Sequence, residues 1–154
     1  MLLPLAGTFT SLHYHLVFST KDRFPMIHAD LQPRLYEYFG GIIRSEEAIL
    51  CSAGGMADHV HLLARLPARL AVADLMRVLK SKSSAWIHET FPAQRKFAWQ
   101  EGYGAFTVSR SDLGRVQKYI ASQPRHHRLR TFQDEFLRLL AAHGIEYDER
   151  LIWK

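Results

Sequence analysis

The stretch AILCSAGGMADHVHLLARL, residues 48–66, decides the expected fold. Its first part, residues 48–53, is a short apolar run. Its last part, residues 59–66, alternates apolar side chains with others, as a half-buried strand does. Gly54 and Gly55 between the two parts supply the turn chemistry of a hairpin. We therefore predict two antiparallel strands joined at the glycine pair.

A strand and a helix are expected upstream of the hairpin. Residues 8–19 alternate apolar side chains with more polar neighbours, which predicts a strand. Residues 31–42 carry apolar side chains at three- and four-residue spacing, as a helix with one packed face requires. A loop around Pro25 separates the two.

Downstream of the hairpin the same two patterns recur. Residues 74–88 have a helical apolar stripe, with the basic outer face of the helix opposite it. Residues 97–109 alternate aromatic with small side chains, which predicts a strand, and the glycines of residues 102–104 indicate a bulge or a close backbone approach.

The remaining residues predict C-terminal helices. Ser111 or Asp112 can cap a helix that Pro124 ends or kinks, and Thr131 can cap another that Gly144 closes. The order βαββαβ followed by extra helices predicts an α+β fold, a ferredoxin-like antiparallel sheet with helices on one face. We expect the other face of the sheet to be open for a ligand or a second subunit.

Composition narrows the class of protein. A chain of 154 residues that is 47% hydrophobic fits a single domain over residues 1–154. The 20 Lys and Arg against 15 Asp and Glu leave a net charge of +5, which favours a polyanionic partner. The single cysteine, Cys51, excludes an internal disulfide framework and a multi-cysteine zinc site.

The sequence also predicts where the protein resides. The N-terminal MLLPLAG, residues 1–7, is apolar but lacks the basic start and the length of a signal peptide. No stretch approaches the ~20 apolar residues of a membrane span. We expect a soluble cytoplasmic protein with no membrane contact.

Two pairs of histidines have the spacing of a metal site. His59 and His61 lie two apart on a predicted strand, so both imidazoles leave the same face and can bind one ion. His13 and His15 have the same spacing, so spacing alone does not choose between the pairs. Two unrelated histidines on a solvated face are the alternative interpretation.

A tyrosine and a glutamine share one side of the helix expected after Asp112. Tyr119 and Gln123 are four residues apart and therefore point the same way. Taken alone, a tyrosine at this position is ordinarily an amphipathic packing residue with its hydroxyl in water. The cations around this helix form the densest basic run in the chain, suited to phosphate contact: Arg115, Lys118, Arg125, His126, His127, Arg128 and Arg130.

Six segments together carry more information than any one of them. They are HYHLVFSTKDR from residue 13, GGMADHVHLL at 54–63, LMRVLKSKSSAWI at 75–87, FAWQEGYGAFTVS at 97–109, YIASQPRHHR at 119–128, and FQDEF with GIEYDERLIW near the end. In this order and spacing the chain resembles the HUH single-tyrosine transposases of the smallest bacterial insertion sequences, the insertion-sequence 200/605 type.

The resemblance implies a role for each matching residue. The HUH histidines fall on His59 and His61, the nucleophile on Tyr119, and the third metal ligand on Gln123. It implies metal-dependent cleavage and rejoining of single-stranded DNA through a 5′-phosphotyrosine. Ligand softness suits Mn²⁺ and cellular abundance favours Mg²⁺, so either ion fits this donor set.

The resemblance also implies partners. The expected DNA is single-stranded and carries a hairpin near the element end, and the expected assembly is a homodimer whose tyrosine acts in trans. DNA contacts are expected from the helix over residues 74–88 and from the basic run described above. The candidates on the first helix are Arg77, Lys80, Lys82 and Ser84, and those in the basic run are Arg115, Lys118, Arg125 and Arg128.

Three other functions remain as alternatives. A domesticated relative that processes host palindromes would keep the same catalytic residues and differ in its substrate. A non-catalytic nucleic-acid-binding ferredoxin-like domain would have no need of the complete set His59, His61, Tyr119 and Gln123. A structural metal-binding protein would need the histidines but not Tyr119.

Overall fold

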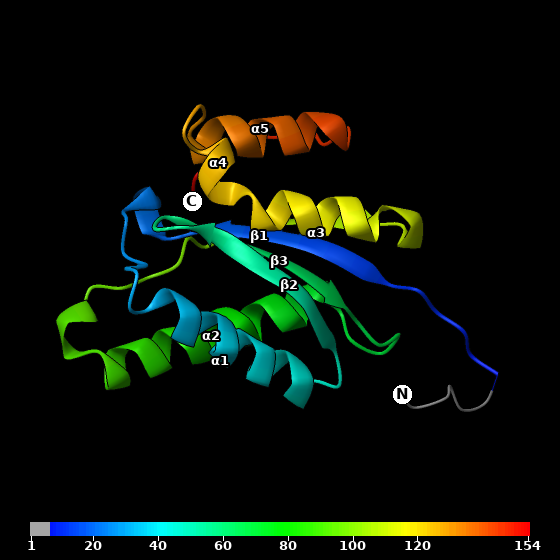
Figure 1. Ribbon diagram of the computed structural model, residues 1–154, viewed down its shortest axis with the longest axis horizontal. Coiled ribbons are helices and arrows are strands. Elements are labelled where there is room, and N and C mark those ends of the chain that lie inside the picture. Colours follow the sequence, from blue (N-terminus) through cyan, green and yellow to red (C-terminus); the bar gives the residue numbers. More distant parts are fainter. Residues whose placement is uncertain (1–6) are drawn as a thin grey trace.

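The chain folds into three layers, with helices on both faces of one sheet (Figure 1). The computed structural model describes residues 7–154. The four strands are antiparallel, in the order β2-β3-β1-β4, which confirms the ferredoxin-like βαββαβ prediction. Their bounds are β1 His13–Ser19, β2 Ile49–Met56, β3 His59–Arg65 and β4 Gly104–Val108.

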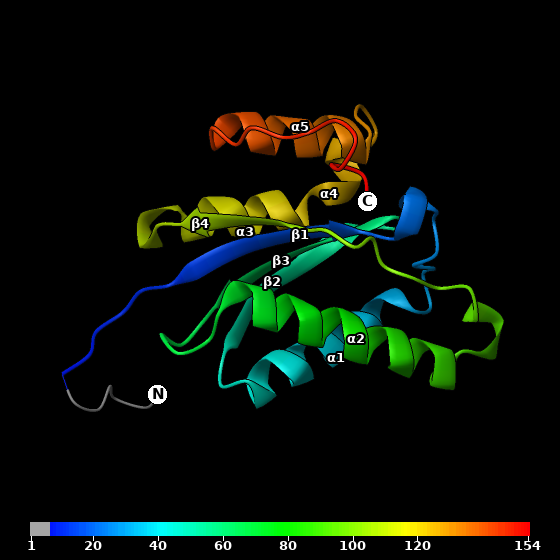
Figure 2. The ribbon, with the colours of Figure 1, turned by 180° about the vertical axis from the view of Figure 1, so that it is seen from behind.

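The helices divide between the two faces of the sheet. On one side lie α1 (Gln32–Ser45) and α2 (Val72–Thr90). On the other lie α3 (Leu113–Ala121), α4 (Gln123–His126) and α5 (Phe132–Ala142), as Figure 2 shows from behind. Short 3-10 helices occupy Lys21–Arg23, Pro92–Gln94 and Arg110–Asp112.

Part of the N-terminal sequence lies outside this description. The apolar stretch at residues 1–7 falls there except for Gly7. Among the helices of residues 7–154, none combines the length and the apolarity needed to cross a membrane.

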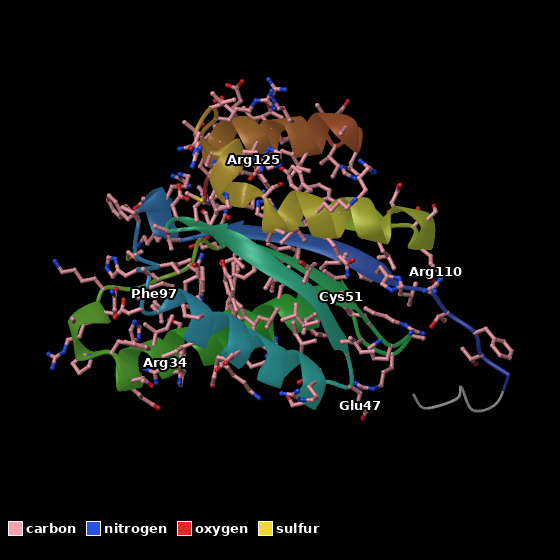
Figure 3. All side chains as sticks on the ribbon, viewed as in Figure 1. Arg34, Glu47, Cys51, Phe97, Arg110 and Arg125 are labelled. Carbon is pink, nitrogen blue, oxygen red and sulfur yellow. The ribbon has the colours of Figure 1, made fainter. Side chains whose placement is uncertain are left out.

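The main hydrophobic core fills the space between the sheet and the first helix pair (Figure 3). Strand residues Leu16, Phe18 and Leu62 point into it and are fully buried, together with Phe39 of α1 and Leu79 of α2. Both helices present the apolar stripe that the sequence predicted. Burial of this surface is the main driving force for the βαββαβ unit.

The expectation of an open second face is wrong. Strand residues Val17 and Phe106 on that face are buried against Phe132, Phe136 and Leu140 of α5. The same strands therefore bury both faces, which explains why Leu16, Val17 and Phe18 form a continuous apolar run rather than an alternation.

The hairpin turns later than the glycine pair suggested. β2 continues through Gly54 and Gly55 to Met56, and the turn is made by Ala57 and Asp58. A Cβ built on Gly54 would lie 2.4 Å from the backbone oxygen of Ile120 in α3. Gly54 is paired with His61, so its missing side chain lets α3 pack closely beside this histidine.

β4 is shorter than the predicted strand over residues 97–109. Before Gly104, Trp99 forms an isolated antiparallel bridge with Thr20, the residue just after β1. The Nζ of Lys80 donates hydrogen bonds to the backbone oxygens of Gln100, Glu101 and Gly102, with Nζ–O distances of 2.8 and 3.1 Å to the first two. The lysine side chain thus takes the place of a neighbouring strand as the hydrogen-bond donor to these carbonyls, which lie just before β4.

The C-terminal helices begin and end much as predicted, with one exception. Thr131 caps α5 by accepting a hydrogen bond from the backbone nitrogen of Asp134 at 3.2 Å, and Gly144 has a positive φ of 63° just after its end. Asp112 precedes α3 but makes no side-chain cap hydrogen bond; its carboxylate lies 3.3 Å from Arg115 instead.

Candidate active site

The two β3 histidines point to the face of the sheet that α3, α4 and α5 cover. His59 and His61 are fully buried, and the His59 ring stacks on Phe132 with centroids 4.6 Å apart. Asp58 Oδ1 lies 2.7 Å from Nδ1 of His59. This contact orients the ring and leaves its Nε2 facing the interior. The alternation of the strand therefore produces the pairing expected of His59 and His61.

Tyr119 and Gln123 reach the same place although the helix between them is broken. α3 ends at Ala121 and α4 begins at Gln123, so the helical segment is interrupted at Ser122. The half-buried Tyr119 ring lies 5.8 Å from the His61 ring, centroid to centroid. Gln123 is fully buried, and its Oε1 lies 2.9 Å from Nε2 of His59. All four residues predicted from the resemblance thus meet in one cluster.

The sequence prediction missed Glu135, which lies at the centre of this cluster. It comes from α5 and is 5% exposed. Its Oε1 lies 2.8 Å from Nε2 of His61 and 3.5 Å from Nε2 of His59. Its Oε2 accepts hydrogen bonds from the Tyr119 hydroxyl and, at 2.9 Å, from Nε2 of Gln123. One carboxylate therefore contacts all four predicted residues.

A third histidine was assigned only to the basic run. His127 follows α4, and its Nε2 lies 2.9 Å from Oε1 of Gln123 and 3.2 Å from Oε1 of Glu135. Its Nδ1 lies 2.8 Å from the backbone oxygen of Arg130. The side chain is thus directed into the cluster rather than toward solvent.

Only one histidine of the strand-one pair takes part. His15 Nε2 lies 2.7 Å from Nδ1 of His61, on the side of that ring away from Glu135. Burial, reinforced by the neighbouring His61, lowers the pKa of His15 to about 3, so the ring is neutral. His13 is the first residue of β1, and its side-chain hydrogen bond within residues 7–154 is to Ser11, with Nδ1 and Oγ 3.5 Å apart. His13 and His15 therefore do not form a ligand pair: His15 contacts His61, whereas His13 contacts Ser11.

Burial and hydrogen bonding set the charges of the site. Burial lowers the pKa of His61, against the opposing effect of Glu135. Burial also raises the pKa of Tyr119, and the hydrogen bond to Glu135 raises it further. Burial raises the pKa of Glu135 too, but the contacts with His61, Tyr119 and Gln123 outweigh it and hold that pKa below its usual range. The site therefore combines an ionised carboxylate with a protonated tyrosine.

The donor set fits a divalent cation. Ligand atoms of His59, His61 and Glu135 all lie within 4.8 Å of one another, and Oε1 of Gln123 faces the same point. Two imidazole nitrogens and two oxygens suit Mn²⁺ or Mg²⁺. Their hydrogen bonds to one another use the same atoms that would bind the ion. This cluster could bind a metal, with Glu135 as a ligand that the sequence prediction did not include.

The predicted DNA-contact residues do not form one surface. Those of α2 lie on the opposite side of the sheet from Tyr119, whereas those of α3 and α4 lie on its own side (Figures 1 and 3). Most are exposed side chains: Arg77, Lys82, Arg115, Lys118, Arg125 and Arg128. Ser84 is half-buried, and Lys80 donates to three backbone carbonyls, as described above.

A hollow opens beside the cluster on the α4 side. His127, Arg128 and Arg130 line one part of it, and Met56 and Ala57 of the hairpin turn line another. Because His127 belongs to both the hollow and the buried cluster, the hollow borders the candidate site, and its lining carries two arginines, Arg128 and Arg130, and two aspartates, Asp58 and Asp134.

Comparison with known proteins assigns the family. Residues 8–123 match the family described as "Transposase IS200 like". The chain belongs to this family. Family membership makes it a transposase, an enzyme that acts on DNA. The matched residues include both β3 histidines, Tyr119 and Gln123, and they end before His127 and Glu135.

Relatives and solved structures agree with this assignment. The chain is 29% identical over 125 residues to the "Transposase for insertion sequence element IS200" of Salmonella typhimurium, covering 77% of this chain and 81% of the relative. It is 27% identical over 133 residues to the "ISDra2 transposase TnpA" of Deinococcus radiodurans, covering 80% and 95%.

Two solved structures have the same fold. One is a putative transposase from Deinococcus radiodurans R1, with a TM-score of 0.66, 25% identity and coverage of 79% of this chain and 98% of that one. The other is a REP-associated tyrosine transposase bound to a REP hairpin, with a TM-score of 0.61, 13% identity and coverage of 82% and 74%. At 13% identity the second structure supports the fold alone.

Proposed function

We propose that this transposase cleaves and rejoins single-stranded DNA at hairpin-bearing ends, with Tyr119 as the nucleophile. The observation that carries the proposal is the position of the Tyr119 hydroxyl. It lies in the same cluster as His59, His61 and Gln123 and is linked to them through Glu135. The tyrosine oxygen attacks the phosphorus, the bond to the 3′ oxygen breaks, and the fragment downstream of the break remains attached to Tyr119 through its 5′ phosphate.

We assign metal binding to His59, His61, Gln123 and Glu135. A divalent cation held there supplies Lewis-acid polarisation of the phosphate and neutralises charge that develops on it. His15 and Asp58 orient the two imidazoles from behind, because each contacts the Nδ1 atom and leaves Nε2 free to bind. Mn²⁺ and Mg²⁺ are the expected ions.

The strand to be cleaved enters, on this proposal, by the hollow beside His127. Arg128 lines that hollow, and Arg125 lies on α4 next to it. Guanidinium groups suit phosphate contacts, which position the backbone without reading sequence. The exposed cations of α2, on the other side of the sheet, would then bind the hairpin rather than the cleaved strand.

The cytoplasmic localisation expected from the sequence stays a prediction.

Our proposal is that Tyr119 attacks DNA bound at the histidines of its own chain. Tyr119 lies beside the histidines of the same chain, whereas the resemblance implies a homodimer with the tyrosine supplied in trans. We propose that the arrangement described here, with Tyr119 in cis, is competent for cleavage. A homodimer remains part of the expectation from the resemblance.

A gel assay of covalent attachment tests the proposed function. Purified protein is incubated with Mn²⁺ and a single-stranded oligonucleotide that carries the hairpin and the cleavage site of the element end, labelled at its 3′ end. The expected result is a protein–DNA band that resists denaturation and disappears in Tyr119→Phe. Absence of the band with wild-type protein, or its persistence in the variant, contradicts the proposal.

A further inference from the structure

Glu135 has more contacts than a metal ligand needs. One oxygen, Oε1, faces His59 and His61, while the other, Oε2, accepts the hydroxyl hydrogen of Tyr119. The matched family region ends at residue 123, so nothing in the match bears on this residue. Its position next to the reacting oxygen of the nucleophile calls for a chemical role.

The surroundings of Glu135 hold it in place. The side chain is 5% exposed, on a helix whose neighbouring residues Phe132 and Phe136 pack on the sheet. Gln123 Nε2 donates to the same Oε2 at 2.9 Å, and His127 Nε2 lies 3.2 Å from Oε1. A carboxylate fixed by this many partners presents Oε2 to the tyrosine in one orientation.

Tyrosine needs such a partner because its hydroxyl is a weak nucleophile. The ordinary pKa of a tyrosine is about 10, and burial and Glu135 raise that of Tyr119, so its hydroxyl is protonated at neutral pH and must lose that proton as it attacks. Among the side chains described for residues 7–154, the one that accepts this hydroxyl hydrogen is Glu135. The nearby His126 ring packs against the tyrosine ring, centroids 4.8 Å apart, but its Nε2 faces Ser122 Oγ at 3.0 Å.

We propose that Glu135 is a further catalytic residue, which takes the hydroxyl proton of Tyr119 on Oε2 during attack. This inference rests on the proposed function of Tyr119. In the forward step the bond between the tyrosine oxygen and phosphorus forms, the bond from phosphorus to the 3′ oxygen breaks, and that oxygen takes one proton from water. In rejoining, a 3′-hydroxyl attacks the phosphotyrosine and gives its proton to the hydroxide left from water, the bond from phosphorus to the tyrosine oxygen breaks, and the proton on Glu135 returns to that oxygen.

The test combines Glu135→Gln with a change in the acidity of the nucleophile. Gln has the shape of Glu and can accept a hydrogen bond, but it does not take up the proton. At saturating Mn²⁺, with the Mn²⁺ affinity of each protein measured by calorimetry, we expect Glu135→Gln to slow adduct formation ~100-fold or more, in the range of general acid–base catalysis. Hairpin binding should stay near wild type.

The second arm replaces Tyr119 by a fluorinated tyrosine whose hydroxyl is more acidic. A nucleophile that loses its proton readily depends less on a base, so the defect of Glu135→Gln should shrink at least tenfold in this background. An equal defect with both tyrosines would mean that Glu135 only supports the structure, and it overturns the inference. A Glu135→Gln rate equal to wild type overturns it as well.

Controls separate this inference from the proposed function. Glu146→Gln changes an exposed acid just beyond α5 and should leave the rate unchanged. Failure of wild-type protein to form any adduct contradicts the role of Tyr119, whereas a wild-type adduct with an unaffected Glu135→Gln contradicts only the role of Glu135. If Glu135→Gln does not fold, Glu135→Ala with added formate replaces it: recovery of the rate supports proton transfer, and no recovery contradicts it.

Discussion

The hydroxyl of Tyr119 donates a hydrogen bond to Oε2 of Glu135, sixteen residues further along the chain. This bond connects the expected nucleophile to a helix that lies outside the family-matched region. It also changes what the loss of the hydroxyl should do. A tyrosine whose hydroxyl faced only solvent would contribute little to stability, whereas a hydrogen bond to a buried carboxylate contributes more.

The first prediction concerns this hydroxyl. Tyr119→Phe should abolish the covalent adduct and lower the free energy of unfolding by about 1.5 to 3 kcal/mol, the range for hydrogen bonds to charged groups. Hairpin binding should remain near wild type because the ring still packs. Urea unfolding measures the stability, and the adduct gel measures the chemistry. A variant as stable as wild type would mean that the bond to Glu135 is not formed in solution.

The metal site gives a graded prediction over four histidines. His59→Ala and His61→Ala should each remove Mn²⁺ binding and cleavage. His15→Ala should weaken Mn²⁺ binding about 10- to 100-fold, because it removes the partner that orients His61. His13→Ala, on the same strand without that contact, is the matched control and should change the affinity little. Calorimetric titration with Mn²⁺ measures all four; equal effects at positions 13 and 15 would refute the orienting role.

Gly54 should be required for the placement of the nucleophile. Gly54→Ala adds a Cβ that would meet the backbone oxygen of Ile120 at 2.4 Å, so α3 must move away from the sheet. Because Tyr119 precedes Ile120, we expect at least a tenfold loss of adduct formation with the chain still folded. Gly114→Ala, in α3 with no atom within 4 Å of the added Cβ, is the control. Similar rates for both variants would argue against the close approach.

The two lysines of α2 should affect different properties, Lys80 the stability of the fold and Lys82 the binding of DNA. Lys80→Met removes the donor to one part-buried and two exposed backbone carbonyls and should lower the melting temperature by a few degrees, since a typical intramolecular hydrogen bond contributes about 0.5–1.5 kcal/mol. Exposed Lys82→Met should leave stability unchanged and weaken hairpin binding, with a shallower salt dependence. Thermal melts and binding at several salt concentrations distinguish these outcomes; the reverse assignment would place Lys80, not Lys82, on the DNA.

Mixing two inactive variants tests whether the tyrosine acts in cis. With Tyr119 in its own chain's site, a mixture of Tyr119→Phe and the double variant His59→Ala, His61→Ala contains no complete site, and no adduct should form. Recovery of cleavage would show a homodimer with the tyrosine in trans, as the resemblance implies. Both variants must first be shown to be folded and to exchange subunits, because an obligate dimer exchanges slowly.

Much of the site could be predicted from the sequence because its parts lie in recognisable local patterns. His59 and His61 share a strand face by alternation, and Tyr119 and Gln123 share a helix face by spacing, although the helix breaks between them. Glu135 escaped because FQDEF was used only as one of the segments that carry the resemblance, and its carboxylate was given no role. A signal was present: Glu135 lies three residues after Phe132 and four before Leu139, on the inward face of α5. A carboxylate there must be paired.

The fold was predicted in its order of elements but not in its second layer. The apolar stripes of α1 and α2 predict that these helices cover one face of the sheet. Burial of the other face depends on α3 and α5 packing back onto the sheet, and no local sequence pattern predicts such a long-range contact. The consecutive apolar residues Leu16, Val17 and Phe18 are the one sequence signal that both faces of β1 are buried. The turn of the hairpin was misplaced for a similar reason, because Gly54 serves contact with α3 rather than the turn.

The position of Glu135 in the chain has a consequence for synthesis. The histidines and the nucleophile leave the ribosome before α5 does, since a chain is made from its N-terminus and folds as it emerges. On the proposed chemistry, a nascent chain that already has its sheet and its tyrosine still lacks the carboxylate that accepts the proton, 74 residues after His61. On that chemistry the active site is complete only once the last helix has been made.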